Sequence, residues 1–189
     1  MRLIRKETRL EKEKHERDKK GVIVGVGNVL QKDDGIGIKV LKYLEAAYVF
    51  PDHVDLVDGG TAGAALQSEI LGKDWLLIID ALDVSGQPGD IRMIAGNDIL
   101  CRPADLKMSP HQVGFFDLIQ LMELNDQGVE EFSILGIIPK DTGVGTELSI
   151  EVEASLDPAV AKVMAWLHEK GIAPKKVEGS VKPDYWWTR

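Results

Sequence analysis

Cysteine is almost absent from this chain, which has only Cys101 among its 189 residues. A lone cysteine cannot form an internal disulfide or supply a cysteine-based zinc site. Its neighbours Arg102 and Pro103 show no pattern of a catalytic thiol, so we interpret it as incidental. A chain without disulfides suits a reducing compartment, and we expect the protein to be cytoplasmic.

Long apolar runs and an excess of positive charge are also missing. No apolar run reaches the roughly 18 residues of a membrane span. The basic N-terminus lacks the apolar segment and cleavage site of a signal peptide. The formal net charge is −8, whereas non-specific nucleic-acid binding needs clustered lysine and arginine. We therefore expect neither a membrane nor a nucleic acid as partner.

Motifs of the common hydrolases and nucleotide-binding proteins are missing or incomplete. There is no Gly-x-Ser-x-Gly elbow and no His-Glu-x-x-His helix. Gly25 and Gly27 match the start of the dinucleotide fingerprint, but Leu30 stands at its third glycine position. No Lys-Ser or Lys-Thr pair completes a P-loop, and the adjacent acids Asp33 and Asp34 would repel a phosphate. A nucleotide-binding α/β oxidoreductase is therefore the weaker alternative.

What is present suffices for one compact domain. Hydrophobic residues make up 44% of the chain, which is enough to bury a core that needs no disulfide or structural metal to stabilise it. We divide the chain into a charged N-terminal extension at 1–20, a globular body at 21–173 and a C-terminal tail at 174–189. The tail carries Tyr185, Trp186 and Trp187, which we expect to fold back onto the body; a docking element is the alternative.

Strand-like and helix-like segments alternate through the body. Apolar runs predict strands at 22–26, 53–57, 75–79, 132–138 and, as a candidate edge, 90–94. Helical spacing predicts helices at 36–48, 62–71, 112–124 and 159–170, while 148–152 fits either a strand or the start of the last helix. This alternation predicts an α/β fold: a doubly wound three-layer sandwich, with a mostly parallel sheet and helices on both faces.

Acidic residues gather where these strands end. In such a sheet, sites form outside the carboxyl ends of the strands. Asp34 and Asp58 follow the first two strands, and His111 lies in a predicted loop before a helix. Two carboxylates and one imidazole suit a divalent transition metal and leave positions open for water or substrate. Each residue also has an ordinary alternative: helix capping for Asp33 and Asp34, a turn for Asp58, and a loop position for His111.

Four ordered motifs together resemble the nickel-iron hydrogenase maturation proteases. They are Gly-Val-Gly-Asn-Val-Leu-x-x-Asp-Asp-Gly-Ile-Gly at 25–37, Asp-Gly-Gly-Thr-Ala-Gly at 58–63, Ile-Asp-Ala at 79–81 and Ser-Pro-His-Gln at 109–112. The resemblance runs from about residue 21 to 171 and leaves out the extension and the tail. The Ser-Pro-His-Gln form resembles members that serve uptake-type hydrogenases.

The resemblance implies an endopeptidase, a hydrolase that removes a C-terminal segment from the hydrogenase large-subunit precursor after nickel insertion. It maps the metal ligands to Asp34, Asp58 and His111, although some members carry Glu where this chain has Asp34. The nickel would be carried by the substrate, and zinc or another divalent metal could replace it. The resemblance favours a monomer.

A non-catalytic nickel-binding maturation chaperone is a second alternative. We expect Asp34→Asn to abolish processing and Asp33→Asn to leave most of it, because Asp33 is interpreted as a local cap.

Overall fold

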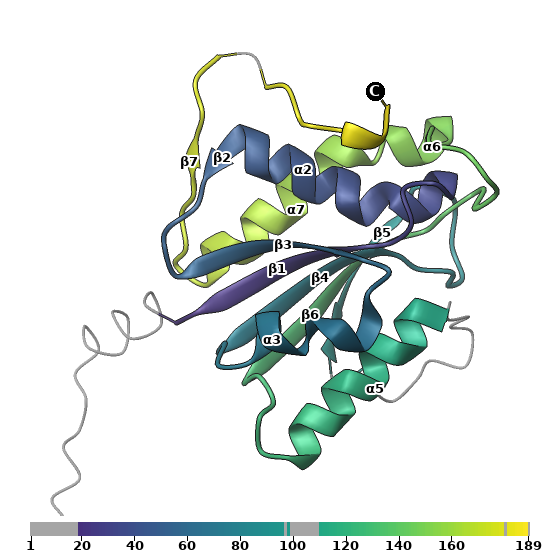
Figure 1. Cartoon of the computed structure of the whole chain (residues 1–189). Helices are drawn as coiled ribbons and strands as arrows, with labels where there is room; N and C mark the ends of the chain where they lie inside the picture. Colours follow the sequence, from purple (N-terminus) through teal and green to yellow (C-terminus); the bar gives the residue numbers. More distant parts are fainter. Residues whose placement is uncertain (1–18, 97, 99–109, 180, 189) are drawn as a thin grey trace, which may run out of the picture.

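The computed structural model describes residues 19–96, 98, 110–179 and 181–188. Its centre is a five-stranded sheet in the order β3-β1-β4-β6-β5 (Figure 1). The strands are β1 (Gly21–Val26), β3 (Val54–Gly60), β4 (Trp75–Ala81), β5 (Ile91–Ala95) and β6 (Glu131–Ile137). All neighbouring pairs are parallel except β5 with β6, so β5 is an antiparallel edge strand.

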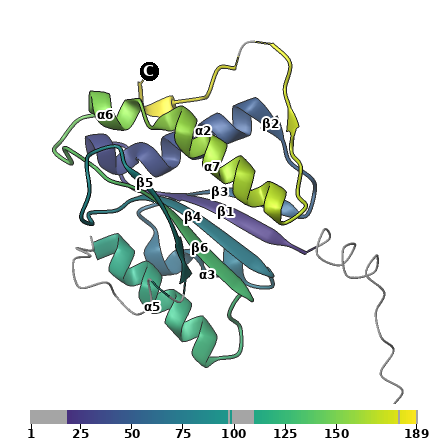
Figure 2. The same cartoon turned by 180° about the vertical axis from the view of Figure 1, so that it is seen from behind.

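Helices cover both faces of the sheet, which confirms the predicted three-layer α/β fold. One face carries α2 (Ile36–Ala47), α6 (Ile150–Glu153) and α7 (Leu156–Glu169), and the other carries α3 (Gln67–Ile70) and α5 (Pro110–Leu124) (Figures 1 and 2). Side chains of β1 alternate between the two cores: Ile23 joins the cluster under α2 and α7, whereas Val22 and Val24 join the cluster against α5. A strand buried on both faces must be apolar throughout, which explains the continuous run at 22–26.

The chain reverses direction across the sheet between β1 and β4. From β1 it moves outward to β3, then crosses back to β4 on the other side of β1. This arrangement makes the carboxyl ends of β1 and β4 a topological switch point, where open α/β sheets place their ligand crevices. The loops that follow these two strands therefore border the expected ligand crevice.

Three local expectations differ from the structure. The predicted helix at 62–71 is a 3-10 turn, η2 (Gly63–Leu66), followed by the short α3, because Gly63 has a φ of 50° that a regular helix cannot accept. Residues 148–152 form no strand, and α6 begins at Ile150. Both β3 and β4 continue past their predicted ends, which places Asp58 and Asp80 inside strands rather than after them.

The C-terminal tail folds back onto the body. Its strand β7 (Lys175–Lys176) pairs antiparallel with β2 (Tyr48–Val49), at the end of α2. The tail then crosses over α2, and its last turn, η3 (Trp186–Thr188), lies beside α6 in both views (Figures 1 and 2). Across the described part of the chain, no helix combines the length and the apolar character that a membrane span requires.

Candidate active site

The loop after β1 folds tightly around a glycine. Gly27 has a φ of 130°, in the region that favours glycine, and a Cβ built there would lie 1.8 Å from the carbonyl oxygen of Asp34. This close approach brings the 3-10 turn η1 (Lys32–Gly35) back over the strand end. Gly27 therefore serves chain packing at this loop.

Asp34 lies at the switch point and is nearly buried, with 7% of its surface exposed. Its Oδ2 accepts a hydrogen bond of 2.7 Å from the backbone N–H of Asn28. The side chain is thus oriented by its own loop. A nearly buried carboxylate at this crevice is suited to bind a cation.

Asp33 does not cap a helix, so that prediction is wrong. Its side chain is fully buried and makes no capping hydrogen bond to η1 or α2 among the described residues. Instead its carboxylate accepts hydrogen bonds from the backbone N–H groups of Lys140, Asp141 and Ser149 and from the Ser149 hydroxyl, at 2.6 to 2.9 Å. Asp33 therefore clamps the loop that follows β6 onto the loop that follows β1.

The backbone adds to this clamp. Lys32 N–H donates to the Gly145 carbonyl at 2.9 Å, and Gly145 N–H donates to the Leu30 carbonyl at 2.9 Å. Lys32 also forms an ion pair with Asp141. The segment 140–149 is thereby held against the loop that carries Asp34.

Asp80 is the site residue to which the sequence analysis assigned no role. It is 3% exposed at the end of β4, where Oδ1 accepts from the Ala81 N–H at 2.8 Å and Oδ2 accepts from Gln112 Nε2 at 2.6 Å. Burial raises the pKa of Asp80 to about 7, and the nearby negative charge of Asp34 adds to the rise, although the two hydrogen bonds oppose it. The sequence did contain a sign of this role, because Asp80 is an acid at the end of an otherwise apolar strand that is buried on both faces.

Asp58 has different surroundings. Its side chain is 34% exposed, Oδ1 accepts from the Gly60 N–H at 3.2 Å, and Oδ2 lies 3.7 Å from Lys42 Nζ. It stands in register with Gly25 of β1, on the side of β1 away from β4. The role of Asp58 as a metal ligand stays a prediction.

His111 is the second residue of α5, so its placement in a loop before a helix is wrong. The helix begins at Pro110, because proline fits the first helical position, where its missing N–H costs nothing. The next residue, Gln112, is buried and bonds both Asp80 Oδ2 and the Ala81 carbonyl, the latter at 2.8 Å. The start of α5 is therefore anchored at the carboxyl end of β4.

The side chain of His111, like the whole of Cys101, lies outside the described residues. Among the residues that the structure does describe, no three His, Cys, Asp or Glu side chains form a group able to hold a metal. The structure thus brings Asp34 and Asp80 together and places the backbone of His111 near Asp80. It does not test the predicted set of Asp34, Asp58 and His111.

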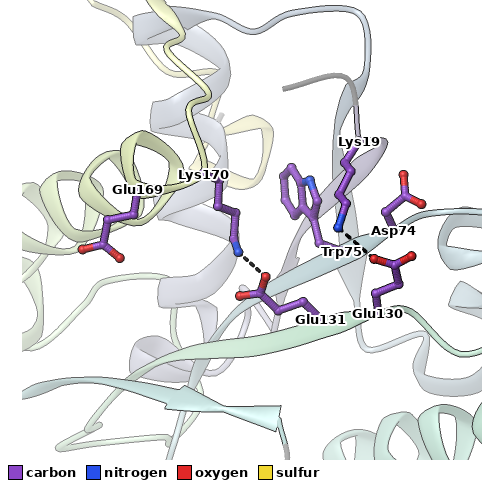
Figure 3. Close-up of a pocket in the computed structure, with 7 residues that line it drawn as sticks. All are labelled: Lys19, Asp74, Trp75, Glu130, Glu131, Glu169 and Lys170. Carbon is purple, nitrogen blue, oxygen red and sulfur yellow. Dashed lines mark hydrogen bonds and ion pairs between the residues drawn. The ribbon is translucent and has the colours of Figure 1, made fainter. Parts of the chain in front are cut away.

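A second concentration of charge lies at the opposite, amino end of the strands. A cavity of about 170 Å³ is lined there by Trp75 and by several charged side chains (Figure 3). Lys19 pairs with Glu130 at 2.8 Å, and Lys170 pairs with Glu131. Both lysines of the cavity are thus paired with glutamates, and the cavity lies at the end of the sheet away from the switch point, so it is not the candidate active site.

The chain matches the family model described as hydrogenase maturation protease over residues 38–166. It is 32% identical to the hydrogenase 2 maturation protease of Escherichia coli over 152 residues, covering 80% of this chain and 92% of that protein. It is 33% identical to the hydrogenase expression/formation protein HupM of Azotobacter chroococcum, covering 85% and 78%. Among solved structures, the maturating endopeptidase HybD of E. coli superimposes with a TM-score of 0.78 at 32% identity, covering 85% of this chain and 99% of HybD.

Proposed function

From the membership of this chain in the hydrogenase maturation protease family, we propose that it is the endopeptidase that removes a C-terminal segment from the nickel-loaded large-subunit precursor of a nickel-iron hydrogenase. The observation that carries this proposal is the pair of nearly buried carboxylates, Asp34 and Asp80, at the switch point of the sheet. Burial and the nearby charge of Asp34 raise the pKa of Asp80, and a buried acid perturbed in this way is typical of functional sites.

The nickel belongs to the substrate in this proposal. Asp34, Asp58 and His111 are the proposed contacts, and we add Asp80 to them. Asp80 is coupled to Asp34 and is anchored to the helix that carries His111, whereas Asp58 is partly exposed opposite Lys42. Carboxylate and imidazole ligands bind metal in their deprotonated forms, so nickel binding would favour the deprotonated form of Asp80. Contacts between these side chains and the nickel would let the enzyme recognise a precursor that already contains its metal.

The remaining parts of the proposal concern the chain as a whole. We assign the peptidase domain to 21–173, the charged extension to 1–20 and the tail to 174–189. The protein acts as a cytoplasmic monomer on the hydrogenase precursor. Zinc or another divalent ion could occupy the nickel contacts when the substrate is absent.

Intact-mass analysis tests the proposal directly. The purified protein is incubated with nickel-loaded and nickel-free precursor, and the mass of the large subunit is followed over time. The expected result is a loss of mass only from the nickel-loaded precursor. Binding of the precursor without any change in its mass would show a non-catalytic chaperone and refute the protease assignment.

Parallel replacements then identify the carboxylates that matter. Asp34→Asn and Asp80→Asn should each abolish cleavage. Asp58→Asn tests the third proposed carboxylate, which lies on the neighbouring strand. Full activity of Asp80→Asn together with loss of activity in Asp58→Asn would exclude Asp80 and leave the set predicted from the sequence.

A further inference from the structure

The tail reshapes the surface above α2 and α6. Tyr185 is half-buried there, and burial raises its pKa to about 12. Its ring lies 5.9 Å from Lys39 Nζ, and it packs against Trp187, with ring centroids 5.3 Å apart. These contacts fix the last turn of the tail beside the first turns of α2, the helix that starts directly after Asp34.

A groove of about 810 Å³ opens between this turn and the body. Lys39 of α2 lines it together with the segment 146–148, α6, and the tail residues Trp187 and Thr188. The tail is therefore one wall of the groove. The opposite wall is part of the loop that Asp33 clamps against the candidate active site.

Two side chains of this groove carry hydrogen-bond donors that have no hydrogen-bond acceptor among the described residues. Lys39 is only 9% exposed, and apart from its contact with the Tyr185 ring it makes no hydrogen bond or ion pair within the described chain; burial lowers its pKa, although the nearby charges of Glu153, Asp33 and Glu147 oppose this. The Nε1 of Trp187 is buried and likewise has no hydrogen-bond partner there. An unpaired buried donor such as the Trp187 Nε1 costs free energy, so a groove lined by Trp187 and by the Lys39 ammonium is suited to bind acceptor groups.

The rim of the groove has the opposite character. Glu147 and Glu153 also line it, and both are exposed. Leu148 and Ile150 contribute apolar surface, and Ile150 is 87% exposed. The groove thus offers donors to acceptor groups, carboxylates to a positive charge and an aliphatic contact.

We propose that this groove binds an extended segment of the precursor polypeptide that carries a basic side chain. Carbonyl oxygens of the segment accept hydrogen bonds from Lys39 and Trp187, and its basic side chain lies against Glu147 and Glu153. An extended peptide has the required hydrogen-bond acceptors along its backbone, whereas a simple anion would be repelled by the carboxylates of Glu147 and Glu153. The inference rests on the proposed function and adds a substrate-binding surface to which the tail contributes Trp187 and Thr188, two residues outside the part of the chain that matches the family model.

Matched variants test the groove. Trp187→Phe removes the indole N–H and keeps an aromatic ring, and Lys39→Met removes the ammonium and keeps an unbranched chain of similar length. Trp186→Phe is the control, because Trp186 is 58% exposed in the same turn and does not line the groove. For each variant, kcat and KM are measured on the nickel-loaded precursor, and thermal unfolding checks that the fold is intact.

The expected change is in KM. Trp187→Phe should raise it roughly threefold to tenfold and Lys39→Met about tenfold or more, with kcat nearly constant, since a neutral hydrogen bond contributes less than a charged one. The double replacement of Glu147 and Glu153 by glutamine should raise KM and reduce its dependence on salt. Trp186→Phe should behave as the wild type.

Two measurements separate failure of the groove from failure of the proposed function. If the wild type cleaves and the groove variants keep its KM while remaining folded, the groove inference is wrong and the protease assignment stands. If the wild type does not cleave, the protease assignment is wrong, and capture of the same precursor on immobilised wild type, Trp187→Phe and Trp186→Phe still tests the groove. Weaker capture by Trp187→Phe alone supports the groove, and equal capture by all three overturns it.

Discussion

Replacing Asp33 with asparagine should destabilise the protein by about 2–4 kcal/mol, an amount worked from its hydrogen bonds. Oδ2 of Asp33 accepts from the Lys140 and Asp141 N–H groups and from the Ser149 hydroxyl, and Oδ1 accepts from the Ser149 N–H. Asparagine keeps only one acceptor oxygen. Its amide group must face at least one backbone N–H, and the least costly orientation leaves Ser149 N–H unpaired.

The magnitude combines two effects. A buried donor left without a partner costs about 1–3 kcal/mol, and each of the three remaining bonds weakens by about 1 kcal/mol when its acceptor loses its charge. Burying a neutral amide costs less than burying a carboxylate, which offsets part of this loss. Since a domain of this size has roughly 5–15 kcal/mol of stability, the variant should still fold.

Urea unfolding followed by circular dichroism measures the change. Asp52→Asn is the matched control, because Asp52 is exposed and its replacement should alter the free energy of unfolding by less than about 0.5 kcal/mol. Ser149→Ala should cost about 1 kcal/mol, and combining it with Asp33→Asn should cost less than the sum of the two. A loss for Asp33→Asn no larger than that of the control would refute the clamp.

The clamp also changes the expectation for activity. The sequence predicted that Asp33→Asn keeps most processing, because Asp33 was interpreted as a helix cap. Since Asp33 instead holds the loop 140–149 against the loop of Asp34, its replacement should lower cleavage of nickel-loaded precursor at least tenfold at temperatures where the variant remains folded. Activity within twofold of the wild type would show that the clamp serves stability alone.

The remaining predictions concern Asp80, Gly37 and His111. Burial raises the pKa of Asp80 to about 7, so its contribution to stability is present below its ordinary pKa and is lost as the pH rises through 7. Between pH 5 and pH 8, the free energy of unfolding, measured in urea, should fall by roughly 2 kcal/mol more for the wild type than for Asp80→Asn. An equal fall in both proteins would contradict this. Gly37→Ala should lower the free energy of unfolding by several kcal/mol or prevent soluble expression, because the added Cβ would lie 2.2 Å from the Ile79 carbonyl oxygen. An unchanged melting temperature would show that α2 does not approach β4 as described. His111→Ala should block cleavage without lowering the melting temperature, because alanine is a strong helix former; cleavage at the wild-type rate would remove His111 from the site. Chelator treatment of the enzyme, followed by removal of the chelator, should leave cleavage of nickel-loaded precursor unchanged; a treated enzyme that stays inactive until metal is added would show a resident metal instead.

Much of the fold could be predicted because its determinants are local in sequence. A continuous apolar run such as 22–26 identifies a strand buried on both faces, and the spacing of apolar residues in 36–47 identifies a helix with one buried side. The alternation of such segments implies the parallel sheet, and the parallel sheet implies a site at its carboxyl edge. The four motifs then identify the family, since their residues and order can be read directly from the chain.

The tertiary structure decided which acids belong to the site and what each one does. Asp33 and Asp34 are adjacent in sequence, yet one binds backbone groups of a loop 107 to 116 residues away, and the other lies beside Asp80 at the switch point. Asp80 acquires its raised pKa only because folding buries it and brings Asp34 close. The groove likewise needs the tail to cross α2 and meet the loop at 146–148. The properties of these groups come from burial and from partners distant in sequence, so no local pattern determines them.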